Sequence, residues 1–151
     1  MTPRTIVPRI AAAAALVVAV FSHAWVVNSA RELHGGLLSF DSGGEIWTNA
    51  ALVAAARTDG TQHASTLYPL AGQLTFALGL AAAGLLVASA FATSRWLTRG
   101  ALAAAVLAAA SAGTFVLAMP SGPAFGLSTG WAVLAFALAA ATGAVLVQRQ
   151  R

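Results

Sequence analysis

The sequence predicts an all-α membrane protein in which four transmembrane helices form a bundle. A small outer segment, with a β-hairpin and a short helix, is expected between the first two spans. Apolar residues make up 59% of the 151 residues and charged residues only 8%, whereas a soluble domain has roughly 25% charged residues. So few charges cannot cover a water-facing surface. The length fits a single membrane domain, residues 1–151.

Four apolar runs predict the spans, because about 20 apolar residues cross the ~30 Å hydrocarbon core of a bilayer. They cover approximately residues 6–28, 67–93, 98–118 and 125–148. No acidic residue occurs in any of them. The boundaries carry helix start and stop signals: Thr66 before the second run, Pro69 in its first turn, Thr98 at the start of the third and Pro120 after its end.

The first run also admits a second interpretation. Arg4 and Arg9, the apolar residues after them and Ser22-His23-Ala24 are typical of a cleavable signal peptide. The apolar run continues through Trp25-Val26-Val27, however, and this extension gives it the length of a full span. We therefore expect a retained transmembrane helix, with cleavage as the alternative.

The arginines predict the orientation of the spans. Six of them share one side of the membrane if there are four spans: Arg4, Arg9, Arg95, Arg99, Arg149 and Arg151. The other side has Arg31, Arg57 and all four acids, which are Glu32, Asp41, Glu45 and Asp59. Because cytoplasmic loops retain arginine and lysine, both termini are expected in the cytoplasm.

The same composition indicates the source membrane and the absence of a nucleic-acid partner. Many alanines with arginine but no lysine are typical of a GC-rich bacterial genome, which predicts a bacterial cytoplasmic membrane. The positive charges lie in pairs at helix ends and form no basic stripe, so we expect no binding to nucleic acid.

Small residues at four-residue spacing predict where the helices pack. In a membrane, close helix contact depends on small side chains, and this spacing places them on one helix face. The candidate packing residues are Ala71, Thr75, Gly79 and Ala83 in the second span, Ala101, Ala105, Ala109 and Gly113 in the third, and Ala135, Ala139 and Gly143 in the fourth. They predict a tight bundle without a wide pore.

Two polar side chains within the spans need hydrogen-bond partners. His23 and Gln73 both fall near the outer ends of their spans, where they form a candidate polar cluster. Ordinary hydrogen bonds between helices are the simpler interpretation. No carboxylate lies in a span, which argues against a proton or ion path.

The outer segment, residues 29–66, is the only sizeable polar region. Two short runs flank the turn cluster Asp41-Ser42-Gly43-Gly44, which predicts a β-hairpin. The alanine-rich stretch Asn49–Arg57 predicts a short helix lying on the membrane. Leu37, Phe40 and Trp47 are expected to anchor the segment to the outer helix ends.

Neither a cofactor, a metal site nor an enzyme activity is expected. The chain has no cysteine, which excludes disulfides and thiolate chemistry. His23, His34 and His63 are widely spaced and lack a zinc-binding pattern. Ser42 is followed by two glycines but lacks the G-x-S-x-G frame of serine hydrolases.

In its order of parts, the chain resembles the claudin and peripheral-myelin-protein-like tetraspan families. Trp25 closes the first apolar run, and Gly36-Leu37-Leu38 stands where those families have a Gly-Leu-Trp motif. The resemblance implies an outer β-sheet between the first two spans and a small second outer loop. This chain departs from the family pattern at Leu38, which replaces tryptophan, and in lacking the two cysteines that follow the motif.

Together these features predict a non-enzymatic tetraspan protein that acts by contacting other membrane proteins or copies of itself. Its expected partners are the lipid bilayer and either a membrane protein or a homo-oligomer. The candidate contact residues of the outer segment are Trp25, Gly36, Leu37, Phe40 and Trp47. The alternative is a small transporter or lipid-handling component with a cavity near His23 and Gln73.

Overall fold

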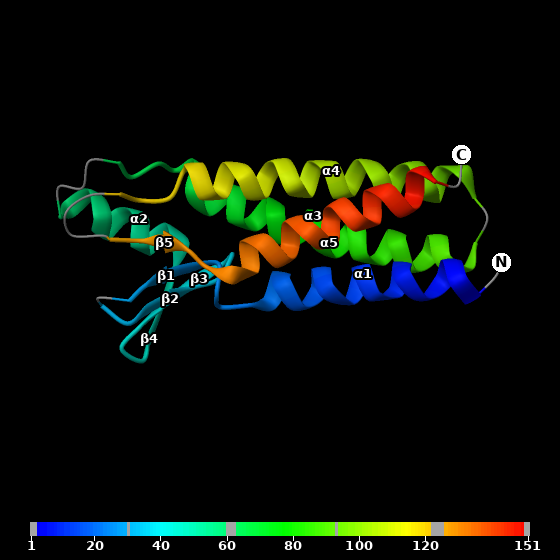
Figure 1. The fold of residues 1–151 in the computed structure, drawn as a ribbon. Helices are drawn as coiled ribbons and strands as arrows, with labels where there is room; N and C mark the ends of the chain where they lie inside the picture. Colours follow the sequence, from blue (N-terminus) through cyan, green and yellow to red (C-terminus); the bar gives the residue numbers. More distant parts are fainter. Residues whose placement is uncertain (1–2, 30, 60–62, 93, 122–125, 150–151) are drawn as a thin grey trace.

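The structure is a computed structural model and describes residues 3–29, 31–59, 63–92, 94–121 and 126–149. Its described elements are, in chain order, α1 (Pro3–Phe21), β1 (Val26–Asn28), β2 (Leu33–Gly35), β3 (Ser39–Ser42), β4 (Glu45–Thr48), α2 (Asn49–Thr58), α3 (Leu67–Phe91), α4 (Arg95–Leu117), β5 (Ser128–Thr129) and α5 (Trp131–Gln148). Figure 1 shows the long helices side by side, with the sheet and α2 at one end and both termini at the other.

The long helices pack in a closed order: α3 lies against α1 and α4, and α5 lies against the same two helices. Three of them, α3, α4 and α5, are long and apolar enough to cross a membrane, while the apolar part of α1, Ile6–Phe21, is shorter. Large apolar side chains, among them Leu74, Leu107 and Leu138, are exposed along them. So much exposed apolar surface indicates a membrane-embedded protein.

The first predicted span is wrong at its outer end. The helix ends at Phe21, and Val26–Asn28 form strand β1. The Ser22 hydroxyl accepts a hydrogen bond from the Ala24 amide at 3.1 Å, which stabilises the turn out of the helix. The β-branched pair Val26-Val27 favours a strand. The residues expected to lengthen the span therefore belong to the outer sheet.

The other spans differ from the prediction mainly at their ends. The second agrees with α3, although its predicted last residue, Thr93, lies outside the described residues. The third begins earlier, at Arg95, so Thr98 lies inside α4 and its hydroxyl donates to the Ser94 carbonyl at 3.1 Å. The fourth begins later, at Trp131, and its predicted start, Phe125, also lies outside the described residues.

The predicted packing faces are buried in α3 but only partly in α4 and α5. All four candidate residues of α3 are buried, and Ala139 and Gly143 of α5 are buried with Ala135 half-buried. In α4 the buried small residues are Ala101, Ala104, Ala105, Ala108 and Ala112, so the prediction is wrong for Ala109 and Gly113, which are exposed. A strict four-residue step drifts around a helix with 3.6 residues per turn, so the buried stripe mixes three-residue and four-residue steps.

Gly79 and Gly113 therefore differ in what a larger side chain would meet. A Cβ atom at Gly79 would lie 2.7 Å from Val20 Cγ2 and 3.0 Å from the Phe136 ring, whereas one at Gly113 would meet nothing within 4 Å. We expect Gly79→Leu to lower the free energy of unfolding by at least about 2 kcal/mol through overpacking. The matched variant Gly113→Leu should leave it nearly unchanged. Thermal unfolding in mild detergent measures both, and equal loss in the two variants would contradict the packing described above.

Arg9 lies inside α1 as an interhelical contact, although the sequence suggested only an orientation signal for it. Its side chain is 1% exposed. One guanidinium nitrogen donates to the Ser89 carbonyl at 2.6 Å and to the Ser89 hydroxyl at 2.7 Å, and the other to the Leu146 carbonyl at 3.5 Å. Arg9 thus joins α1 to α3 and α5 near the end that holds the termini.

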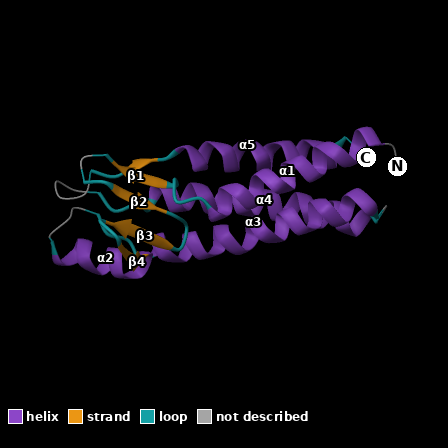
Figure 2. Cartoon of the chain, turned by 90° about the horizontal axis from the view of Figure 1, so that it is seen from below, coloured by secondary structure: helices purple, strands orange, loops and turns teal. Residues whose placement is uncertain are grey.

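The sheet has five antiparallel strands in the order β4-β3-β2-β1-β5. Figure 2 shows them grouped beyond the ends of the long helices. The predicted hairpin is formed by β3 and β4, with Ser42 opposite Glu45. Gly43 and Gly44 form its two-residue turn with φ of 61° and 92°. Positive φ at both turn positions matches the strand twist and favours glycine.

Candidate interaction surface

Two connections of the chain form the outer end of the molecule: the one between α1 and α3 and the one between α4 and α5. Strand β5, which lies between α4 and α5, pairs with β1 through Val26 opposite Thr129. The segment before α3 is also tied to the segment after α4, because His63 and Ser121 exchange backbone hydrogen bonds of 3.1 Å in both directions. The sheet and the segment before α3 are therefore both bonded to the connection between α4 and α5.

Trp25 fixes the sheet to the helices. It is fully buried, and its ring lies edge-on to Phe115 of α4 and Phe136 of α5, with centroid distances of 5.8 Å and 5.2 Å. Its indole nitrogen donates to the Ala19 carbonyl at 2.7 Å, and its backbone amide donates to the Gly35 carbonyl at 2.9 Å. The Trp25 side chain thus contacts α4 and α5 and binds the last turn of α1, while the Trp25 backbone is bonded to the sheet.

The Gly36-Leu37 pair lies directly on α3. Leu37 is 1% exposed, and its carbonyl oxygen occupies the place where a Cβ atom at Gly72 would stand. The same oxygen accepts a hydrogen bond of 2.7 Å from the buried Asn49 side-chain amide. Gly72 is therefore the position where the outer segment approaches a helix most closely, because only a hydrogen atom fits there.

The short helix α2 is present where it was predicted, and it packs against α3 and strands β3 and β4. The Thr48 hydroxyl caps it by accepting from the Ala51 amide at 3.2 Å. Its apolar residues Leu52, Val53 and Ala56 are buried. Phe40 is also buried and lies over Gly35, where a Cβ atom would be 2.6 Å from its ring.

The prediction that Trp47 anchors the segment is wrong. Trp47 is 37% exposed, and its indole nitrogen donates to Glu45 Oε2 at 3.2 Å. It pairs across the strands with the buried Phe40, and such partners share a sheet face. However, β4 is an edge strand and all four of its residues are exposed.

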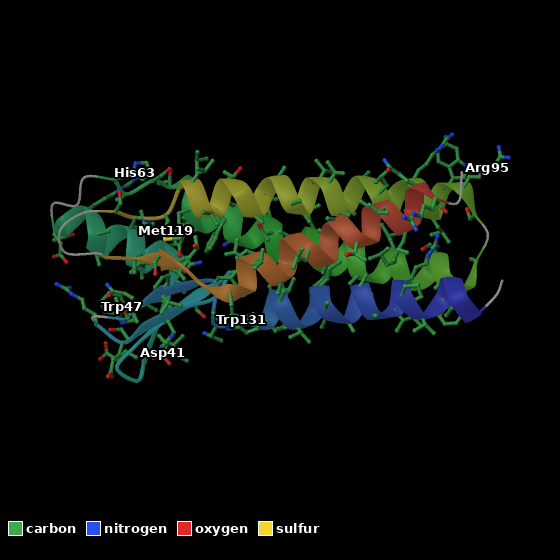
Figure 3. All side chains as sticks on the ribbon, viewed as in Figure 1. Asp41, Trp47, His63, Arg95, Met119 and Trp131 are labelled. Atoms are coloured by element: carbon green, nitrogen blue, oxygen red, sulfur yellow. The ribbon has the colours of Figure 1, made fainter. Side chains whose placement is uncertain are left out.

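The outer edge, which we define as β4 with Glu45, Ile46, Trp47 and Thr48, is the most prominent unpaired feature of the described sheet. Ile46 is 73% exposed, and Figure 3 shows Trp47 and Asp41 on the part of the sheet that projects away from the helices. An edge strand presents backbone groups that a further strand can bind. The outer edge therefore combines an exposed apolar side chain on each face of the sheet with backbone hydrogen-bonding capacity.

The predicted polar cluster is not brought together. His23 and Gln73 are both exposed, and no hydrogen bond joins them in the described part of the chain. His23 belongs to the turn after α1, while Gln73 lies in α3 just after Gly72, on an exposed face. The histidines likewise form no group of three possible metal ligands with other described residues.

Sequence reasoning missed three residues that join distant segments of the fold: Arg9, Asn49 and Gly72. Arg9 could have been noticed because it falls inside the predicted first span, and a charged side chain inside a span needs a hydrogen-bonding partner. Gly72 and Asn49 carried no comparable signal, since their roles depend on the Leu37 carbonyl, which is distant in sequence.

Comparison with known proteins gives no family for this chain: no protein-family model matches it, and no curated protein matches it in sequence.

Proposed function

We propose that this chain is a four-span protein of a bacterial cytoplasmic membrane, with both termini in the cytoplasm, that acts without catalysis by binding another protein at its outer edge. The observation that carries the proposal is β4, an edge strand whose four residues are all exposed, with Ile46 and Trp47 among them. Trp25 and Leu37 fix the base of its sheet to the helices. A rigid, apolar strand edge suits partners that add a strand to a sheet.

The lengths of the helices and the exposed tryptophans support the four-span arrangement. At a rise of about 1.5 Å per residue, α1 and α5 extend about 27–28 Å, which is close to the ~30 Å hydrocarbon core. Trp131 begins α5 at the sheet end, and Trp96 is the second residue of α4 at the opposite end; both are exposed. Tryptophans at both interfaces are typical of membrane-spanning helices.

The distribution of charges supports the orientation. The described arginines Arg9, Arg95, Arg99 and Arg149 belong to the helix ends near the termini, and Figure 3 places Arg95 there. All four acids belong to the segment between α1 and α3. This asymmetry favours a cytoplasmic location of the termini.

The layout also supports a relationship to the claudin and peripheral-myelin-protein-like families. A sheet lies between the first two long helices in the chain, the Trp25 amide donates to the Gly35 carbonyl at its base, and Leu37 is buried. Leu38, in the place of the family tryptophan, is exposed. We propose this relationship as one of architecture, since a shared fold does not imply a shared function.

The absence of natural cysteine makes a sharp test possible. A single cysteine at Ile46→Cys is the only thiol in the chain, and the chain has no lysine. A short thiol–amine crosslinker applied to intact cells therefore reports a lysine-bearing partner at the outer edge, and a thiol–thiol crosslinker reports a second copy of the chain. We expect one discrete adduct, either at twice the chain mass or at the mass of chain plus partner. Asp59→Cys, exposed at the end of α2, is the control and should give little adduct.

A second variant separates specific binding from chance collision. Adding Trp47→Ala to Ile46→Cys removes apolar surface from the outer edge without touching the buried anchors, so the adduct should weaken by about tenfold, the effect of roughly 1.4 kcal/mol. Equal adducts from Ile46→Cys and Asp59→Cys, or an adduct unaffected by Trp47→Ala, would contradict the proposal.

A further inference from the structure

A lateral groove runs between α1 and α3 in the half of the molecule nearer the termini. It has a volume of about 570 Å³ and is lined only by apolar residues and glycine. The two helices touch on both sides of it: Val20 lies against Gly79 toward the sheet, and Arg9 binds Ser89 toward the termini. Between these contacts the helix surfaces separate and leave the groove.

Residue size gives the groove its shape. Small residues of both helices line it, and two of them, Ala13 and Ala83, are buried. Larger side chains such as Val18 and Val87 also line it and are exposed. Gly84 belongs to the lining, and a Cβ atom added there would meet nothing within 4 Å. The groove is thus open to an occupant at Gly84.

The position of the groove favours a lipid with a negative headgroup. Its lining residues belong to helix segments that would lie in the hydrocarbon core, where acyl chains are the solvent. Beyond it, toward the termini, the charged residues of the described chain are all arginines: Arg9, Arg95, Arg99 and Arg149. Arg99 also lies 5.8 Å from the Trp96 ring centroid. Basic groups beside transmembrane helices on the cytoplasmic side bind anionic headgroups.

We propose that the α1–α3 groove holds one acyl chain of an anionic phospholipid from the cytoplasmic leaflet, whose headgroup lies at the arginine-rich end of the helices. This rests on the membrane orientation proposed above and is independent of what binds the outer edge. The groove also differs in position from the cavity expected near His23 and Gln73, since it lies in the opposite half of the long helices.

The test uses the full-length protein, purified in mild detergent, and native mass spectrometry to count retained phospholipids. Delipidated protein is then titrated with phosphatidylglycerol or phosphatidylcholine. The unaltered chain should retain one phospholipid and prefer phosphatidylglycerol. Gly84→Leu fills the groove and should weaken binding by about tenfold, the effect of excluding about two methylene groups.

Gly113→Leu is the matched control, because it adds the same side chain to open space on α4 and should bind lipid like the unaltered chain. Arg95→Gln with Arg99→Gln should remove the preference for phosphatidylglycerol. Equal lipid retention by Gly84→Leu and the unaltered chain would overturn the proposal. So would a change in oligomeric mass on Gly84→Leu without loss of lipid, which would identify a second copy as the occupant.

Failure here is distinguishable from failure of the proposed function. A chain that leaves the membrane fraction in alkaline carbonate without detergent would not be integral, and both proposals would fall. A chain that stays in the membrane but gives no adduct at Ile46→Cys would lose only the outer-edge proposal.

Discussion

Replacing Gly72 with alanine should lower the free energy of unfolding by at least about 2 kcal/mol, although the change adds a single methyl group. The new Cβ atom would occupy the place of the Leu37 carbonyl oxygen and would lie 3.1 Å from the Phe115 ring. Neither group is the flexible end of a long side chain, so the outer segment must move away from α3. Thermal unfolding in mild detergent measures the loss.

Gly84→Ala on the same helix is the matched control. Its Cβ atom meets nothing within 4 Å, and alanine favours a helix over glycine by up to about 1 kcal/mol, so this variant should be as stable as the original chain or slightly more so. Hydrogen exchange adds a local readout: Gly72→Ala should expose amides of β2 and β3, while those of α4 stay protected. Equal stability of the two variants would show that the outer segment does not pack closely against Gly72.

Replacing Trp25 with alanine should cost about 3–5 kcal/mol, the range for truncating a large buried aromatic side chain. The change leaves a cavity between Phe115 and Phe136 and removes the hydrogen bond to the Ala19 carbonyl. Because Trp25 links α1, α4 and α5 to the sheet, we expect the sheet to separate from the helices before the helices separate from one another.

Limited proteolysis in detergent tests that order of events. Trp25→Ala should become sensitive to cleavage between β1 and α2 at temperatures where the long helices remain intact. Trp131→Ala is the control, since Trp131 is 61% exposed and should contribute little to stability. Similar proteolysis of both variants would mean that Trp25 does not hold the sheet.

The two aromatic contacts of Trp25 bear on the proposed binding at the outer edge. A strand that projects from a mobile loop would lose much of its binding free energy to ordering. Here β4 extends a sheet whose base is tied to three helices and to the segment after α4. The entropy cost of ordering β4 is met when the protein folds, so under the proposed function Ile46 and Trp47 can bind a partner without paying it again.

The helical regions were largely predictable because their signal is local. Composition and run length indicate where apolar helices lie: α3 begins at its predicted first residue, Leu67, and ends at Phe91, just short of the predicted end. The turn at Gly43-Gly44 was also readable, since a turn depends on a few adjacent residues.

The first span shows where local reasoning fails. Hydropathy alone cannot distinguish Trp25-Val26-Val27 as the end of a membrane helix from the same residues as a buried strand. What decides is pairing with Leu33–Gly35 and with β5, which is contributed by the far part of the chain. The error at Ala109 and Gly113 has a related cause, because a small residue is buried only if a neighbouring helix faces it.

The sequence by itself determined the apolar helices, the asymmetry of charge and the hairpin, because each depends on composition or on residues close together in the chain. The tertiary structure alone decided the roles of Arg9 and Gly72, the exposure of Trp47 and the groove beside Gly84. Each of these depends on which atoms of distant segments meet: Ser89 with Arg9, Leu37 with Gly72, and α1 with α3. Such contacts are fixed by the packing of the folded chain.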